Sequence, residues 1–227
     1  SAVSGAVGDM PPVSREEQTL YVREINSINF QRPEEGYKVS SVFYDFMDGK
    51  VWMFRMEIPD EGEAAGKQRV CMQIYETTEK KVERYVLTPE IPGHDEYWIS
   101  SAGLTEQGEI SFKMWEKKGE ENFYFAVKTD MQGKVLEVTE PFPEEEEYPW
   151  NVEVFSEIRT FHLQDGRTVV SRWDEAGQTS VLTWFGGEKA GQELGRLEGE
   201  KPGALCIGEA GALYCLAGDS LICWVTE

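Results

Sequence analysis

The residue types that most often carry out chemistry are present in this chain, but none of them forms a recognised catalytic pattern. His94 lies in a proline-rich link and His162 ends a strand-like run, and neither has neighbours at metal-ligand spacing. The four cysteines show no C-x-x-C spacing and sit in apolar runs: Cys71, Cys206, Cys215 and Cys223. We predict buried free thiols, with one disulfide among the last three cysteines as the alternative. We expect no catalytic residue, no metal site and no cofactor.

Acidic side chains are far more abundant than any other candidate group. The chain has 42 acidic and 22 basic residues, which gives a formal net charge of −20. With so many carboxylates, some pair meets the spacing of a glycosidase site by chance, so such a pair indicates no activity. The run Glu144–Glu147 lacks EF-hand spacing and is interpreted as a solvated loop. The net charge repels phosphate backbones and anionic headgroups, which argues against nucleic-acid or membrane-surface binding and favours cationic ligands.

Seven tryptophans raise the alternative of carbohydrate binding, because flat aromatic faces stack on pyranose rings when they are exposed. Most of them lie in strand-like runs, where packing between sheets uses such bulk, so we expect core positions: Trp52, Trp98, Trp115, Trp173, Trp184 and Trp224. Trp150 has a loop context and is the best candidate for a ligand platform. The binding residues are otherwise unknown from the sequence.

A glycine-centred turn between strand-like runs recurs along the chain, at Gly49, Gly108, Gly166 and Gly211. Such recurrence is typical of propeller-type repeats. Helical stripes are scarce, and short β-branched and aromatic runs fall into groups over 39–87, 95–138, 152–197 and 204–226. The first three groups hold four strands each and the last holds three. We therefore predict an all-β, β-propeller-type repeat of four-stranded antiparallel blades.

The alternative fold is a β-sandwich. The runs Val51–Met56 and Asn122–Val127 are apolar on both faces, as strands between neighbouring blades would be, which favours the propeller. Residues 1–17 have the composition of a flexible linker. The run Thr19–Ile25 has no blade of its own and would complete the last group if four blades closed on themselves. Four blades is at the small end of the known range, so a fragment of a larger propeller is the favoured interpretation.

The strand–Asp-Gly–strand repeats, followed by Val169–Gly177 and Asp219–Trp224, resemble the N-terminal propeller-like regions of extracellular lipoproteins from gut Firmicutes (Clostridia). Those regions often precede a solute-binding module of an ABC transporter. The resemblance covers most of residues 18–227 and implies an extracytoplasmic, non-catalytic region, with no functional residue to carry over.

The function expected on this basis is a non-enzymatic binding or interaction module, accessory to a solute-binding lipoprotein. Its location would be extracellular, at a cell surface, with a lipid anchor in the full-length protein. We expect a monomer with a protein or glycan partner. Since no run approaches about 18 apolar residues, we expect no membrane insertion of this segment. The alternative function is a carbohydrate-binding or carbohydrate-active propeller domain.

Overall fold

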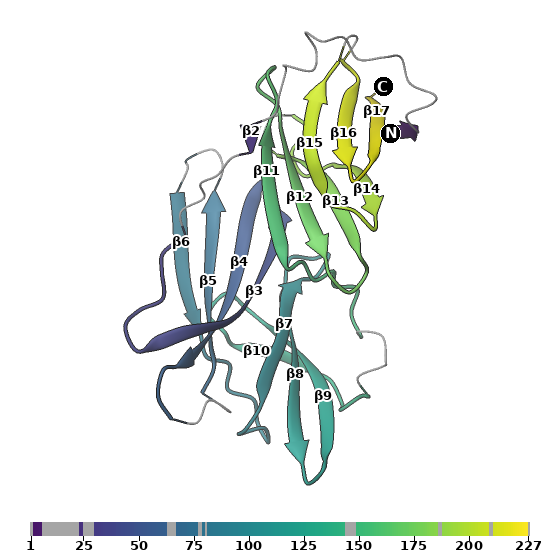
Figure 1. The fold of residues 1–227 in the computed structure, drawn as a ribbon. Coiled ribbons are helices and arrows are strands. Elements are labelled where there is room, and N and C mark those ends of the chain that lie inside the picture. The colour runs from purple at the N-terminus through teal and green to yellow at the C-terminus, as the bar shows by residue number, and fades with distance from the viewer. Residues whose placement is uncertain are drawn as a thin grey trace. The chain divides into compact units, whose positions relative to one another are not determined.

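The chain folds into antiparallel β-sheets, as a computed structural model shows (Figure 1). The structure describes residues 2–5, 23–24, 30–62, 67–76, 79, 81–143, 149–185, 188–208 and 211–226. No α-helix occurs among these residues, and accordingly none of them belongs to a helix able to span a bilayer. The all-β class predicted from the strand-like runs is confirmed.

The strands among the described residues form four sheets. The first sheet has the order β3 (Tyr37–Met47), β4 (Lys50–Pro59), β5 (Arg69–Glu76), β6 (Lys81–Leu87). The second sheet contains β7 (Trp98–Leu104), β8 (Ile110–Lys118), β9 (Glu121–Thr129) and β10 (Val135–Val138). The third sheet contains β11 (Glu157–His162), β12 (Thr168–Asp174), β13 (Thr179–Phe185) and β14 (Glu193–Glu198), with β2 (Arg23–Glu24) beside β11. The fourth sheet contains β15 (Pro202–Ile207), β16 (Leu213–Ala217), β17 (Ser220–Thr226) and β1 (Ala2–Gly5).

The recurring glycine lies between two consecutive strands in each sheet: β3 and β4, β7 and β8, β11 and β12, and β15 and β16. Gly49, Gly108, Gly166 and Gly211 all have positive φ, between 69° and 88°. In the β3–β4 hairpin Asp48 also has positive φ, as a two-residue type I′ turn requires. Consecutive strands are neighbours within each sheet, without the crossovers of a Greek-key sandwich. This meander is the topology of a propeller blade, so the four-stranded antiparallel groups predicted from the sequence are confirmed.

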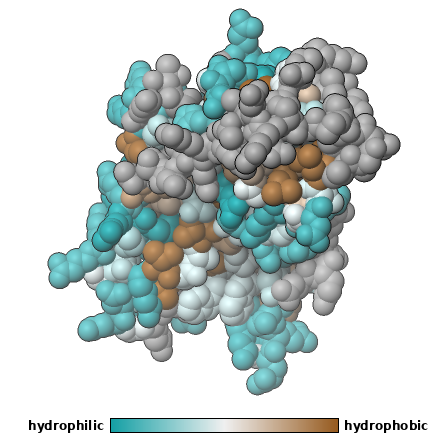
Figure 2. Space-filling model, turned by 45° about the horizontal axis from the view of Figure 1, so that its top comes forward, coloured by the Kyte–Doolittle hydropathy of each residue, from teal (hydrophilic) through white to brown (hydrophobic). Residues whose placement is uncertain are grey.

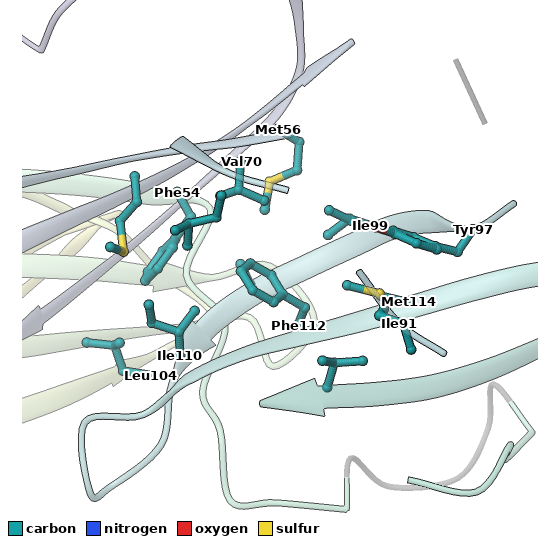
Figure 3. Packing of buried hydrophobic residues seen from close by; sticks show 14 of the residues in the cluster. Phe54, Met56, Val70, Ile91, Tyr97, Ile99, Leu104, Ile110, Phe112 and Met114 are labelled. Carbon is teal, nitrogen blue, oxygen red and sulfur yellow. The ribbon is translucent and has the colours of Figure 1, made fainter. Parts of the chain in front are cut away.

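The described residues form two compact units, each built from two sheets. Residues 29–155 contain the first and second sheets, whose facing side chains form one core that includes Phe54, Phe112 and Met114 (Figure 3). Residues 1–28 with 156–227 contain the third and fourth sheets, around a core that includes Leu182 and Trp224. The assignment of residues 18–227 to a single domain stays a prediction.

The third group begins later than predicted. Its first strand was expected from Val152, but β11 begins at Glu157. The reason is Phe155, whose side chain is fully buried and whose carbonyl accepts a hydrogen bond from the Tyr44 amide of β3 at 2.8 Å. Residues 152–155 therefore belong to the unit of the first two sheets, and not to the third sheet.

The N-terminal strand that completes the fourth sheet also differs from the one predicted from the sequence. Residues 2–5, expected to lie in a linker, form β1 and pair antiparallel with β17. Within the run Thr19–Ile25, Arg23 and Glu24 pair with β11 of the third sheet instead, and the rest of that run lies outside the described residues. The edge of β17 offers backbone groups, which pair with any extended segment whatever its side chains. A terminal strand thus pairs with the last sheet, as the less favoured interpretation of the sequence required, and that strand is β1.

Candidate functional site

The loop between the first and second sheets, residues 88–97, is here called the entry loop. Its sharpest turn spans Ile91 to His94, where the His94 amide donates to the Ile91 carbonyl at 3.0 Å. Pro92 and Gly93 are the central residues, and Gly93 has a φ of +81°. Proline followed by a glycine of positive φ is the pattern of a type II turn. The sequence therefore sets the shape of this loop locally.

Two buried side chains hold the entry loop on the core of the second sheet. Ile91 and Tyr97 belong to the same hydrophobic cluster as Ile99 and Met114 (Figure 3). The Tyr97 hydroxyl donates to the Pro89 carbonyl at 2.5 Å. Burial raises the pKa of the Tyr97 phenol, and the Glu90 carboxylate adds to the effect, so the hydroxyl remains a donor at neutral pH.

His94 is held from two sides. Its ring stacks on Phe125, with 4.2 Å between centroids and 23° between planes. Its Nδ1 lies 3.0 Å from Oε1 of Glu116, a carboxylate that Lys118 Nζ also approaches, at 3.1 Å. Burial disfavours the charged form of Glu116, but the contacts from His94 and Lys118 outweigh it and lower the pKa of this carboxyl. The imidazole therefore fixes the loop against the second sheet.

The entry loop encloses an open cleft of about 450 Å³, lined by every residue from Pro89 to Tyr97 except Glu96. Glu90 and Asp95 are exposed, and neither carboxylate has an ion-pair partner among the residues that the structure describes. The lining includes no serine, threonine or cysteine. Rigid walls, two carboxylates and no nucleophile make a cleft suited to binding a ligand that carries hydrogen-bond donors or a positive charge.

The other predicted candidates lie elsewhere. His162 is exposed at the end of β11, with Nδ1 3.2 Å from the Thr168 hydroxyl of β12. All four cysteines are free, as expected for buried thiols, although Cys206 is only half-buried. Burial raises the pKa of Cys215 to about 12, and the nearby Cys206 adds to the shift. The acidic run Glu144–Glu147 lies outside the described residues.

The register of the fourth sheet shows why its three cysteines do not pair. Cys206 and Cys223 both lie opposite Tyr214, one on each side, so two strand spacings of roughly 4.8 Å separate them. Cys215 follows Tyr214 directly and points to the other face of the sheet. A disulfide needs Cβ atoms about 4 Å apart on a common side, which this register does not provide.

The tryptophans divide into two groups. Trp173, Trp184 and Trp224 are buried, as predicted. The half-buried group is Trp52, Trp98, Trp115 and Trp150. Trp150, the candidate platform, makes a cation–π contact with the Lys128 ammonium, which lies 4.5 Å from its ring centroid. Trp98 and Trp115 lie directly opposite each other on β7 and β8, with 6.2 Å between ring centroids and 17° between planes. These two near-parallel indoles are a second candidate surface beside Trp150.

A second polar cluster, missed by the sequence reasoning, lies on one face of the first sheet. Glu57 of β4 is fully buried and accepts hydrogen bonds from Arg55 Nε at 2.8 Å and Arg69 Nε at 3.0 Å. Gln73 of β5 is fully buried on the same face. The signal available was the alternation of charged residues within otherwise apolar strands, at Arg55 and Glu57.

The fold and this site define an all-β protein of antiparallel sheets with an acid-rimmed cleft at the entry loop. No protein-family model matches the chain, and no curated protein matches it. Among solved structures, the chain is similar to that of a streptogramin B lyase, at 10% identity over 91% of this chain and 98% of that chain, with a TM-score of 0.20. At this identity and TM-score, the similarity carries no conclusion about this chain.

Proposed function

We propose that this protein is a non-enzymatic binding module that works outside the cytoplasm, as an accessory part of a lipid-anchored, solute-binding lipoprotein. The observation that carries the proposal is the preformed cleft of the entry loop. Because Ile91, Tyr97 and His94 already fix its walls, a ligand would pay little for ordering them. Glu90 and Asp95 favour a ligand with a cationic group, either free or on a partner protein.

The cleft is tested by titrating the protein with L-arginine, L-lysine and spermidine in isothermal calorimetry. We expect at least one of these cations to bind, and Glu90→Lys and Asp95→Lys each to weaken that binding at least tenfold. Glu96→Lys makes the same charge change at an exposed residue outside the cleft, and should change affinity less than twofold. Equal losses in all three variants, or no binding by any of the cations, would count against the cleft.

The location is tested on intact cells that express the full-length gene. A membrane-impermeant biotinylation reagent should label the protein before lysis, while a cytoplasmic marker in the same cells stays unlabelled. Labelling that appears only after lysis would contradict an extracellular role, whatever the cleft binds.

Carbohydrate binding is the second candidate function, and the Trp98–Trp115 pair favours it. Tyr124 of β9 lies opposite Trp115, so three half-buried aromatic rings follow one row across the second sheet. Near-parallel rings offer the flat apolar surface on which pyranose faces stack. Lys113 lies over Tyr124, with Nζ 5.1 Å from the ring centroid, and supplies a hydrogen-bond donor beside the row.

Affinity electrophoresis in gels containing barley β-glucan or xylan tests this second function. We expect the wild-type chain to be retarded by one of these polysaccharides, and Trp98→Ala and Trp115→Ala to migrate freely. Trp150→Ala is the matched control, because it removes an indole of similar burial elsewhere in the same unit, and should remain retarded. Absence of retardation in both gels would dismiss the row as a glycan platform.

A further inference from the structure

A segment outside the strands, residues 30–36, contacts the polar face of the first sheet through Gln31 and Glu34 and is here called the strap. The Gln73 side chain makes two hydrogen bonds with the backbone of Gln31. Its Oε1 accepts from the Gln31 amide at 2.7 Å, and its Nε2 donates to the Gln31 carbonyl at 3.0 Å. Arg55 Nη1 donates to the same carbonyl at 2.7 Å. One buried face of the sheet thus recognises the main chain of the strap.

Three residues further on, Glu34 occupies a carboxylate-binding fork. Arg69 Nη2 lies 3.2 Å from one oxygen of Glu34 and Arg84 Nη2 lies 2.9 Å from the other. The Arg69 guanidinium also stacks over the Tyr37 ring, 3.5 Å from its centroid. Hydrogen bonding from Arg69 and the charge of Arg84 lower the pKa of Glu34, so the bound group is the carboxylate.

The sheet side of this contact is organised without the strap. Glu57 is fully buried and bonds both Arg55 and Arg69, which fixes the two guanidinium groups before anything binds them. The strap side is less constrained, because the Glu34 side chain is 56% exposed. A preorganised receptor that faces an exposed ligand group permits exchange of that group at low cost.

The charges and hydrogen-bonding groups of this face determine which ligand can replace the strap. Without Glu34, three arginines face one buried carboxylate, an excess of positive charge in a chain of net charge −20. Losing the strap removes the Gln31 partners of the Gln73 side chain and of Arg55 Nη1, which is unfavourable because both side chains are buried. A competitor must therefore supply a backbone amide for Gln73 and a carboxylate for Arg69 and Arg84.

We propose that this face of the first sheet is a peptide-binding site which the strap occupies as a built-in competitor. Its ligand is an acidic peptide of a partner protein, with a glutamate three residues after the residue that Gln73 binds. The site is separate from the cleft of the entry loop, so either one can fail its test without the other.

The test uses the full chain and a fluorescein-labelled peptide with the strap sequence Phe-Gln-Arg-Pro-Glu-Glu-Gly, followed by fluorescence anisotropy. The chain variant Glu34→Ala weakens the strap and should bind this peptide at least tenfold more tightly than the wild-type chain. A peptide with glutamine at the position of Glu34 should bind the same variant at least tenfold more weakly.

The receptor arginines are tested in the Glu34→Ala background. Arg84→Gln should weaken peptide binding at least tenfold, and it leaves the buried Glu57 contacts intact. Arg196→Gln is the matched control, because Arg196 is an exposed strand residue that also pairs with a glutamate, and it should change affinity less than twofold. Circular dichroism at 25 °C verifies that each variant is folded.

Three results would overturn the proposal. The first is equal peptide affinity of the wild-type and Glu34→Ala chains, including no binding to either. The second is equal binding of the glutamate and glutamine peptides. The third is a wild-type chain that elutes as a dimer and becomes monomeric with Glu34→Ala, because the occupant would then be the strap of a second copy.

Discussion

At the scale of single residues, the charged side chains that organise this molecule lie within its sheets. Figure 2 shows one face on which hydrophilic side chains surround smaller hydrophobic patches, as the acidic composition indicates. The buried ion pairs of Glu57 and the partly buried contacts of Glu116 are less expected. Buried charges persist when they are paired. Glu57 accepts hydrogen bonds from Arg55 and Arg69, and Glu116 is paired with His94 and Lys118 by distance.

Glu116 gives a pH-dependent prediction. Its folded-state pKa is lowered, so its contribution to stability is complete above the unfolded pKa of about 4.3 and is lost as pH falls through the folded value. Thermal unfolding should therefore show Glu116→Gln melting below the wild type at pH 7, with the gap closing toward pH 3. Glu120→Gln, at an exposed turn, is the control and should show no gap at either pH. A gap that is constant with pH would refute the ion-pair explanation.

At the scale of elements, strands and turns that local sequence determines could be predicted. Strand boundaries and strand partners that depend on contacts between distant segments could not. The strand groups follow from residue periodicity, and turns such as Gly49 follow from the φ that glycine tolerates. The start of β11 and the identity of the strand beside β17 depend on backbone contacts across the fold. The cleft combines both cases. Its Pro92–Gly93 turn could be predicted from the local sequence, whereas the contact between His94 and Glu116 could not, because it joins two separate elements.

Gly93 gives the prediction at this scale. Its φ of +81° is a left-handed conformation, so Gly93→Ala should destabilise the protein by about 1 kcal/mol even though an added Cβ would meet no atom within 4 Å. Urea unfolding measures the change. Gly203→Ala is the control, because its φ is not positive and an added Cβ meets its nearest atom at an ordinary 3.5 Å. Similar losses for both variants would show that backbone conformation is not the cause.

At the scale of the whole molecule, the two ends of the chain share one sheet. β1 pairs with β17 from Ala2 opposite Thr226 to Gly5 opposite Cys223. The fourth sheet thereby has four strands, like the first and second sheets, and the outer edge of β17 is paired within the chain. A terminal strand used in this way links the stability of the C-terminal sheet to residues at the opposite end of the sequence.

Removing residues 1–5 should therefore lower the stability of the unit that contains β17. The residues of β17 that pair with β1 include Cys223 and Trp224, which are both buried. Without β1 the edge of β17 loses several backbone hydrogen bonds, at about 1 kcal/mol each. We therefore expect the free energy of unfolding, measured in urea, to fall by about 2 kcal/mol. A synthetic peptide of residues 1–8 added in excess should restore part of the loss, while the same peptide with Val3→Pro should not, because proline lacks the ladder N–H. An unchanged urea midpoint after the deletion would mean that β1 adds no stability, and that the fourth sheet is held by β15, β16 and β17 alone.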